Sequence, residues 1–115
     1  MPEWVRFEPT EEGLRGTVSV PGDKSVSHRA LLLGSVACSP VVVRGFLPSA
    51  DTLATLDAVR ALGVRVEVLS TTELVIHGVG WEGLQEPDDV IDVGNAGTLL
   101  RLLPGLVAAL SLIHI

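Results

Sequence analysis

Two short segments of the chain carry the residue types that bind anions. The first places basic and hydroxyl side chains directly after a Pro-Gly pair, in the order Pro21-Gly22-Asp23-Lys24-Ser25-Val26-Ser27-His28-Arg29. Lys24 supplies a mobile point charge, and Arg29 supplies a planar fork that suits phosphate or carboxylate oxygens. Ser25 and Arg29 are four residues apart, so a helix places them on one face. Free backbone N–H groups at the start of that helix would add to the attraction, and the segment therefore predicts a phosphate-binding corner.

Chemistry alone leaves other interpretations of this first segment open. It is not a GxxxxGK[ST] nucleotide loop, because Asp23 stands where that motif requires Gly directly before the lysine. Taken alone, Lys24 and Arg29 are more often solvated surface charges than ligands. His28 is more often a packed or hydrogen-bonded structural residue than a catalytic base.

The second segment combines small residues with two polar side chains and an arginine, in the order Asp92-Val93-Gly94-Asn95-Ala96-Gly97-Thr98-Leu99-Leu100-Arg101. Asn95 and Thr98 can cap a helix or donate to a ligand, and Arg101 follows Gly97 by one helical turn. The simpler interpretation is a tight turn in which the glycines serve backbone geometry only. Two anion-capable corners in one small chain favour a shared site.

Periodicity and turn residues predict the elements that position these corners. Alternation indicates strands, and apolar residues at helical spacing after Ser or Asp caps indicate helices. The expected order is a strand over 14–20, a helix over 25–37 with Ser25, Ser27 or Asp23 as its cap, a strand over 41–43, a helix from a cap at 49–51 to residue 62, a hairpin of strands over 64–69 and 74–77, a strand over 90–93, and a helix from residue 98 onward.

Composition narrows the class of protein. A chain of 115 residues with 47% hydrophobic and 3% aromatic residues predicts one α/β unit with an aliphatic core. A net charge of -6 argues against nucleic acid and anionic membranes as partners. The run from 102 to 115 is too short for a membrane span, and the N-terminus lacks a secretory signal, which favours the cytoplasm. We expect the single cysteine, Cys38, to be a buried small hydrophobe.

The two segments closely resemble the two signatures of the EPSP synthase (3-phosphoshikimate 1-carboxyvinyltransferase) family. The first resemblance runs from Pro21 to Ala30, and the second comprises Gly94-Asn95-Ala96-Gly97-Thr98 followed by Arg101-Leu102-Leu103. Between them, Ser49-Ala50-Asp51-Thr52 with Leu62-Gly63 is similar to the family's intervening helix. The resemblance covers residues 14 to 109, with the motifs in the family's order and separation.

The resemblance implies the enolpyruvate transferase fold, an inside-out α/β barrel built of βαββαβ repeats. It also implies transfer of the enolpyruvyl group of phosphoenolpyruvate to the 5-hydroxyl of shikimate 3-phosphate, in aromatic amino acid biosynthesis, without metal or organic cofactor. Carried over position by position, the residues that would bind shikimate 3-phosphate are Lys24, Ser25 and Arg29. Those that would bind phosphoenolpyruvate are Lys24 and Gly97, to which we add Asn95, Thr98 and Arg101.

The resemblance covers only the first part of such an enzyme, so we expect an N-terminal fragment that is inactive alone. Residues 1–20 would form initial strands that pack with the second domain of the full enzyme. Residues 21–110 would be the first part of the N-terminal substrate-binding domain, and residues 111–115 a non-native tail. The family's catalytic acid and base come from later sequence. We expect the full-length enzyme to be a monomer.

Two other functions remain as alternatives. The enolpyruvyl transferase that acts on UDP-N-acetylglucosamine shares the fold and the chemistry. Its first corner carries Lys-Asn and lacks the Ser-His-Arg continuation, so Ser25 and Arg29 argue against it. A non-catalytic phosphate-binding module would also lack an acid–base pair, although truncation explains the same absence more simply.

Overall fold

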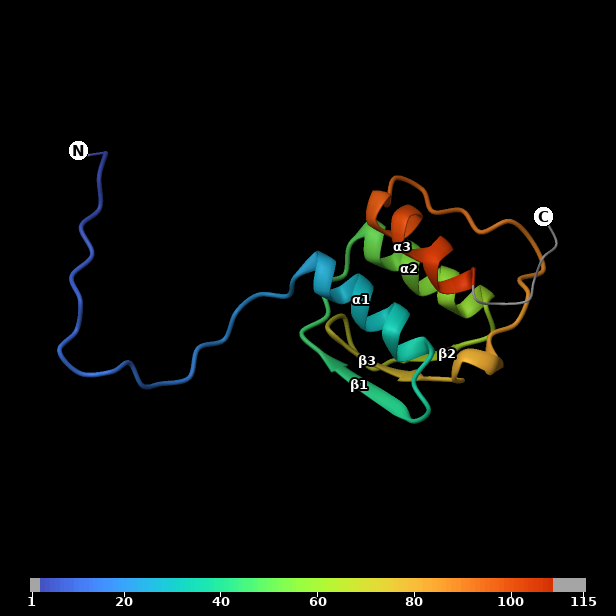
Figure 1. Cartoon of the computed structure of the whole chain (residues 1–115), viewed down its shortest axis with the longest axis horizontal. Coiled ribbons are helices and arrows are strands. Elements are labelled where there is room, and N and C mark those ends of the chain that lie inside the picture. Colours follow the sequence, from blue (N-terminus) through green and yellow to red (C-terminus); the bar gives the residue numbers. More distant parts are fainter. Residues whose placement is uncertain (1–2, 109–115) are drawn as a thin grey trace.

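The computed structural model describes residues 3–108, so the predicted tail at 111–115 lies outside the described residues. Two helices pack on one face of a small antiparallel sheet, and a third packs on those helices (Figure 1). In chain order the elements are α1 (Lys24–Ser35), β1 (Pro40–Arg44), α2 (Ala50–Ala61), β2 (Arg65–Val68), β3 (Glu73–His77), the short 3-10 turn η1 (Trp81–Gly83) and α3 (Gly97–Val107).

The first two helices begin at polar caps, as their sequences predict. Asp23 caps α1 by accepting a hydrogen bond from the backbone N–H of Val26 at 2.8 Å. Ser49 and Thr52 form a reciprocal capping box at the start of α2. Such caps satisfy N–H groups that have no partner inside the helix. Gly63, at φ +90°, then turns the chain out of α2 into β2.

The sheet has the strand order β1-β3-β2, and both pairings are antiparallel. The predicted hairpin is confirmed as β2 and β3, which pair with Val66 opposite Ile76. β1 pairs along the other edge of β3, with Val42 opposite Val75. Side chains alternate between the two faces of a strand. Leu74 and Ile76 therefore share the face of β3 that is covered by the helices, and both are buried.

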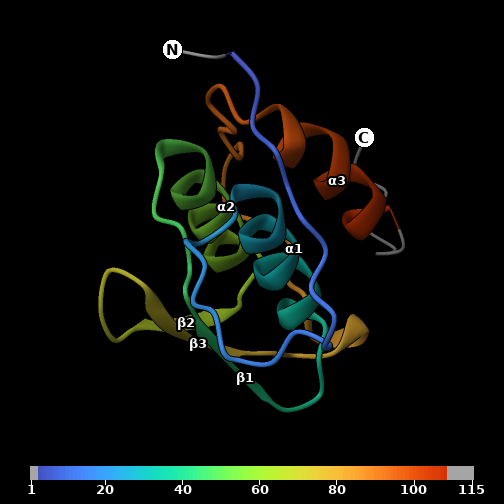
Figure 2. The same cartoon turned by 90° about the vertical axis from the view of Figure 1, so that its left-hand side faces the viewer.

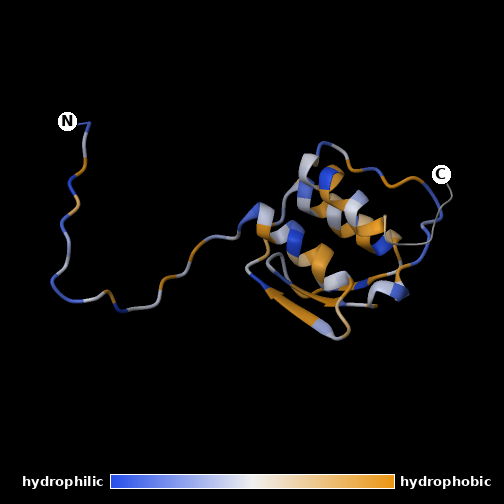
Figure 3. Ribbon diagram, viewed as in Figure 1, coloured by the Kyte–Doolittle hydropathy of each residue, from blue (hydrophilic) through white to orange (hydrophobic). Residues whose placement is uncertain are grey.

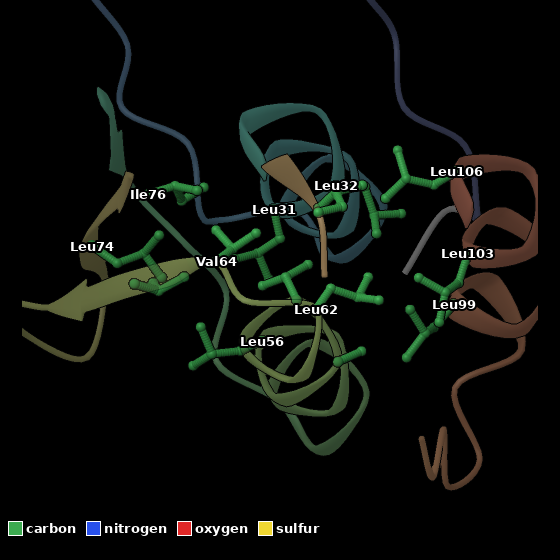
Figure 4. Packing of buried hydrophobic residues seen from close by; sticks show 14 of the residues in the cluster. Leu31, Leu32, Leu56, Leu62, Val64, Leu74, Ile76, Leu99, Leu103 and Leu106 are labelled. Carbon is green, nitrogen blue, oxygen red and sulfur yellow. The ribbon is translucent and has the colours of Figure 1, made fainter. Parts of the chain in front are cut away.

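The core lies between the sheet and the helices. α1 packs on β1 and β3, α2 packs on β2, and α3 packs on α1 and α2 without lying on the sheet. Leucine and valine side chains from all of these layers meet in one cluster (Figure 4). Its fully buried members are Leu31, Ala58, Val59, Ile76 and Leu99. This cluster holds the helix starts in fixed positions relative to one another.

Two predicted strands do not form. The segment 14–20 has no strand structure, and residues 3–20 extend away from the helices and the sheet (Figure 1). It keeps the mixed hydrophobic and polar pattern of a strand (Figure 3), but no neighbouring strand within residues 3–108 supplies hydrogen-bond partners. The segment 90–93 is likewise an irregular approach to α3. Both segments have the local sequence pattern of a strand, but neither forms one because no neighbouring strand in the described part of the chain pairs with it.

One smaller expectation was also wrong. Cys38 is exposed, because it follows the end of α1 in the turn toward β1. The predicted last helix is confirmed, and it continues through Pro104 and Gly105 to Val107. Leu100, whose carbonyl loses its helical N–H partner at Pro104, is exposed to water. None of the helices within residues 3–108 is long and apolar enough to cross a membrane.

Gly22 gives a first testable prediction. A Cβ at this position would collide with the backbone carbonyl of Gly45 and would lie 3.1 Å from the backbone nitrogen of Leu47. We therefore expect Gly22→Ala to lower the free energy of unfolding by about 1–3 kcal/mol, the usual cost of overpacking. Urea denaturation would measure this. Gly13→Ala is the control, since nothing lies within 4 Å of a Cβ there. Equal stability of both variants would contradict the close approach.

Candidate anion-binding site at the helix starts

All three helices begin at the same end of the molecule. In Figure 1 they run from left to right, and Figure 2 looks toward their starts. The first signature segment lies at the start of α1, and the second lies at the start of α3. Helix starts carry partial positive charge and free N–H groups, so this end of the molecule favours anions.

The first corner is built around Lys24, the only lysine in the sequence. Its ammonium nitrogen lies 3.1 Å from Oδ2 of Asp51, which stands in the first turn of α2. Both side chains keep access to solvent, with 49% and 27% of their surfaces exposed. Asp51 was predicted only as part of a helix cap. Its pairing with Lys24 could not be read from two residues 27 positions apart.

Ser25 and Arg29 occupy one exposed face of α1, as their spacing predicts. One guanidinium nitrogen of Arg29 donates to the backbone carbonyl of Ser25 at 3.0 Å, which turns the fork toward the start of the helix. No carboxylate within residues 3–108 forms an ion pair with Arg29. Its remaining N–H donors are therefore available to an anion.

Backbone groups add further donors at the same place. Asp23 accepts hydrogen bonds from the N–H of Val26 and, through its carbonyl, from the N–H of Ser27. Within residues 3–108, the N–H groups of Lys24 and Ser25 have no such acceptor. The first corner thus presents two backbone donors, a hydroxyl, an ammonium and a guanidinium within one and a half turns of helix.

Gly22 and Ser27 shape this corner without facing a ligand. The close neighbour of Gly22 is the protein's own backbone at Gly45. The Ser27 hydroxyl donates to the carbonyl of Asp23 at 2.7 Å and accepts from the N–H of Leu47 at 3.0 Å. Both residues fasten the start of α1 to the turn that follows β1.

His28 is a buried structural residue, in agreement with the interpretation favoured from its sequence context. Its side chain has no exposed surface, and its Nδ1 lies 2.6 Å from the hydroxyl of Thr55 on α2. Burial lowers the pKa of His28 below its usual value of 6.5. The charges of Lys24 and Arg29 also lower this pKa, and the charge of Asp51 opposes them. The imidazole is therefore neutral at pH 7.

The lowered pKa of His28 predicts how stability depends on pH. As pH falls below about 6.5, the unfolded chain binds a proton at this histidine before the folded chain does. The free energy of unfolding should therefore be highest above pH 6.5 and should fall as pH drops toward the lower pKa of the folded state. Urea denaturation between pH 7.5 and 5.5 would show the fall. It should shrink in His28→Asn and persist in His77→Asn, whereas equal slopes in all three proteins would refute the assignment.

The second corner is a tight turn of small residues. Gly94, at φ +56°, adopts the left-handed conformation, and its N–H donates to the carboxylate of Asp92 at 2.8 Å. Neither Asn95 nor Thr98 caps α3, because the cap position falls on Ala96, which has no side chain to do so. Asn95 is exposed, which leaves its amide available to a ligand.

Gly97 and Arg101 lie together on the first turns of α3. A Cβ on Gly97 would lie 3.7 Å from Nη1 of Arg101, an ordinary contact distance. Packing among the described residues therefore does not require glycine here. Arg101 is exposed and forms no ion pair within residues 3–108. Thr98, which follows Gly97 in the sequence, is half-buried.

The structure places the two corners at one end of the molecule but does not join them. No hydrogen bond or ion pair links residues 21–29 to residues 92–101. Among residues 3–108, no group of His, Cys, Asp and Glu side chains has the arrangement of a metal site. The fold and the two corners define an α/β unit with two candidate anion-binding corners at one end.

Comparison with known proteins identifies the family of this unit. Residues 9–114 match the EPSP synthase (3-phosphoshikimate 1-carboxyvinyltransferase) family. The chain belongs to this family, which confirms both the resemblance and the α/β enolpyruvate transferase fold.

Individual relatives agree. The 3-phosphoshikimate 1-carboxyvinyltransferase of Chloroflexus aurantiacus is 55% identical over 95 residues, which are 83% of this chain and 22% of that protein. The protein of the same name from Bacillus cereus is 46% identical over 102 residues, or 89% of this chain and 24% of that protein. The solved EPSP synthase of Acinetobacter baumannii superimposes with a TM-score of 0.75 at 48% identity, over 82% of this chain and 21% of that chain. The chain thus spans less than a quarter of the length of these relatives.

Proposed function

We propose that this chain is the part of an EPSP synthase that holds shikimate 3-phosphate at the start of α1. The complete enzyme would transfer the enolpyruvyl group of phosphoenolpyruvate to the 5-hydroxyl of shikimate 3-phosphate and release phosphate. One observation carries the proposal. The first family signature forms a solvent-accessible set of anion donors at a helix start, in a chain that belongs to the family.

Different donors of this corner would bind different oxygens of the ligand's phosphate. The guanidinium of Arg29 suits two phosphate oxygens, while the Ser25 hydroxyl and the backbone N–H groups suit others. The ammonium of Lys24 would turn from Asp51 toward the anion or bridge the two. Its exposed surface and single carboxylate partner leave room for this exchange.

Phosphoenolpyruvate would lie between Lys24 and the start of α3. The absence of a packing requirement for glycine at position 97 supports close approach of a ligand to that backbone. Arg101 and Asn95 are exposed on the same corner, and Thr98 follows in the first turn. The reaction also needs a proton donor to C3 of phosphoenolpyruvate and a base for the attacking hydroxyl, and we assign both to sequence beyond this chain. The chain alone would therefore bind but not catalyse.

The surfaces of the chain support the proposed division into domains. Residues 3–20 expose most of the surface of Trp4, Phe7 and Leu14, which suits strands that pack against a second domain. A groove of about 320 Å³ between α1 and α3 is lined by Leu32, Leu102 and Leu106 among others, which suits packing against the remainder of the N-terminal domain. We propose that the complete enzyme is a cytoplasmic monomer.

Calorimetric titration tests the proposed ligand. Shikimate 3-phosphate should release heat of binding with this chain, and UDP-N-acetylglucosamine should not. Binding of the sugar nucleotide alone would instead assign the chain to the sister transferase. Binding of inorganic phosphate with the same affinity as shikimate 3-phosphate would favour a phosphate-binding module without sugar recognition.

A further inference from the structure

His28 is a buried titratable group whose hydrogen bonding is incomplete. Its side chain has no exposed surface, and its Nδ1 lies 2.6 Å from the hydroxyl of Thr55. Its other ring nitrogen, Nε2, is buried without a hydrogen-bond partner within residues 3–108. A valine or leucine would fill such a position without this cost, so the imidazole calls for an explanation beyond packing.

The ion pair between Lys24 and Asp51 lies one helical turn from the contact between His28 and Thr55. His28 follows Lys24 by four residues on α1, and Thr55 follows Asp51 by four residues on α2. Residues four apart share a helix face, so the ion pair and the hydrogen bond are successive links between the same two faces. Each link joins residues 27 apart in sequence. The buried link therefore fixes the offset at which the exposed link forms.

The unpartnered Nε2 favours one of the two neutral forms of the imidazole. If Nε2 carried the proton, a buried N–H donor would have no acceptor among the described residues, and orphaned buried donors are rare in native structures. A proton on Nδ1 instead gives that nitrogen an acceptor, the hydroxyl of Thr55 at 2.6 Å. The same hydroxyl lies 3.5 Å from the backbone carbonyl of Asp51, the outer limit of a hydrogen bond.

We propose that His28 is a positioning residue for the anion corner: its neutral imidazole donates from Nδ1 to Thr55 and fixes the offset between α1 and α2 at which Lys24 stands beside Asp51. The proposal deepens the proposed function, because the corner that it positions is the site assigned to shikimate 3-phosphate. The position of Lys24 itself can be tested without any ligand.

Protonation of the imidazole should weaken this arrangement. The charged groups that act on His28 are Asp51 on α2 and Lys24 and Arg29 on its own helix, and the two cations oppose a second positive charge. A protonated Nε2 would be a buried donor without an acceptor among the described residues. Because such a donor costs free energy, protonation should favour separation of α1 from α2. Affinity at the corner should therefore fall in acid.

The first experiment reads the tautomer in the unmodified 115-residue chain. Imidazole ¹⁵N–¹H spectra, assigned with His77→Asn and His114→Gln, should show a protonated Nδ1 and a bare Nε2 for His28. They should also show that His28 titrates below pH 6.5. A protonated Nε2 at neutral pH would overturn the proposal, because the imidazole would then accept a hydrogen bond from Thr55 instead of donating one to it.

The second experiment separates positioning from general stability. Thr55→Val removes the hydroxyl at nearly the same volume, and Thr55→Ser keeps it. The single lysine ammonium signal should shift in the valine variant and stay in place in the serine variant. Affinity for shikimate 3-phosphate should fall about five-fold in Thr55→Val, the scale of one hydrogen bond, and change less than about two-fold in Thr55→Ser. A valine variant that is folded, with an unmoved Lys24 signal, would refute positioning even if its melting temperature fell.

The third experiment uses the pH profile. A phosphate monoester has its own second pKa near 6, so the informative quantity is the difference between two proteins. Affinity for shikimate 3-phosphate should fall more steeply from pH 7.5 to 5.5 in the wild-type chain than in His28→Asn, which keeps an N–H donor but does not titrate. Parallel profiles would overturn the role of His28. Absence of binding by the wild-type chain would sink the proposed ligand instead, leaving the lysine signal and the tautomer to decide the positioning role.

Discussion

Replacing Arg29 with alanine should weaken binding of shikimate 3-phosphate by about 1.5–3 kcal/mol, or roughly ten- to a hundred-fold in dissociation constant. Arg29 has no carboxylate partner among the described residues, so its removal costs donors that the ligand would use and frees no charge inside the protein. Lys24→Ala should have an effect of the same size. Its loss additionally leaves Asp51 as an unpaired carboxylate at the corner, which repels an anion. Isothermal titration calorimetry on the folded chain measures both variants.

The matched control is Arg65→Ala. Arg65 stands at the start of β2 beside Glu67, beyond the far end of α2, and its removal changes net charge by the same amount as removal of Arg29. If the effect of Arg29 were only a matter of overall charge, both variants would lose affinity equally. We expect Arg65→Ala to bind within about two-fold of the wild-type chain at 0.15 M salt, where charges this distant are screened.

Leu31→Ala should produce the largest loss of stability, about 2–5 kcal/mol in the free energy of unfolding. Leu31 is fully buried on α1, the helix that packs on α2, α3 and the sheet together. Truncation leaves a cavity at the centre of the cluster that holds the helix starts in place. Because domains of this size are stable by only about 5–15 kcal/mol, this loss would be a large fraction of the total stability. Guanidinium denaturation followed by circular dichroism measures the change.

Leu33→Ala tests the same chemistry two residues away. Leu33 is 66% exposed, so its truncation should change the free energy of unfolding by less than about 0.5 kcal/mol. A loss as large as that of Leu31→Ala would show that the outer face of α1 is covered, which contradicts the packing described above. Together the two variants decide which face of α1 the core occupies.

Local sequence chemistry predicted most of the elements around the site. The caps at Asp23 and Ser49 involve residues within one turn of each other, so the sequence contains all the information that they need. The same holds for the spacing of Ser25 and Arg29 and for the hairpin of β2 and β3. Such features depend on bonds between near neighbours, which composition and periodicity report directly.

Features that depend on distant partners were missed. The strand pattern of 14–20 cannot become a strand where no neighbouring strand pairs with it. The pairing of Lys24 with Asp51, and of His28 with Thr55, depends on the packing of α1 against α2 and leaves no local signal. A four-residue spacing repeated on both helices is the one hint that the sequence contains. It becomes meaningful only once the two helices are known to lie together.

Completing the chain tests the central claim most directly. Residues 1–108 would be joined to the corresponding remainder of the Chloroflexus aurantiacus relative, and phosphate release from phosphoenolpyruvate would be followed with each acceptor. We predict release with shikimate 3-phosphate and none with UDP-N-acetylglucosamine, loss of that activity in the Arg29→Ala form, and no release by the 115-residue chain alone. A folded chimera that works equally well without Arg29, or that accepts only the sugar nucleotide, would contradict the assignment of the first corner to shikimate 3-phosphate.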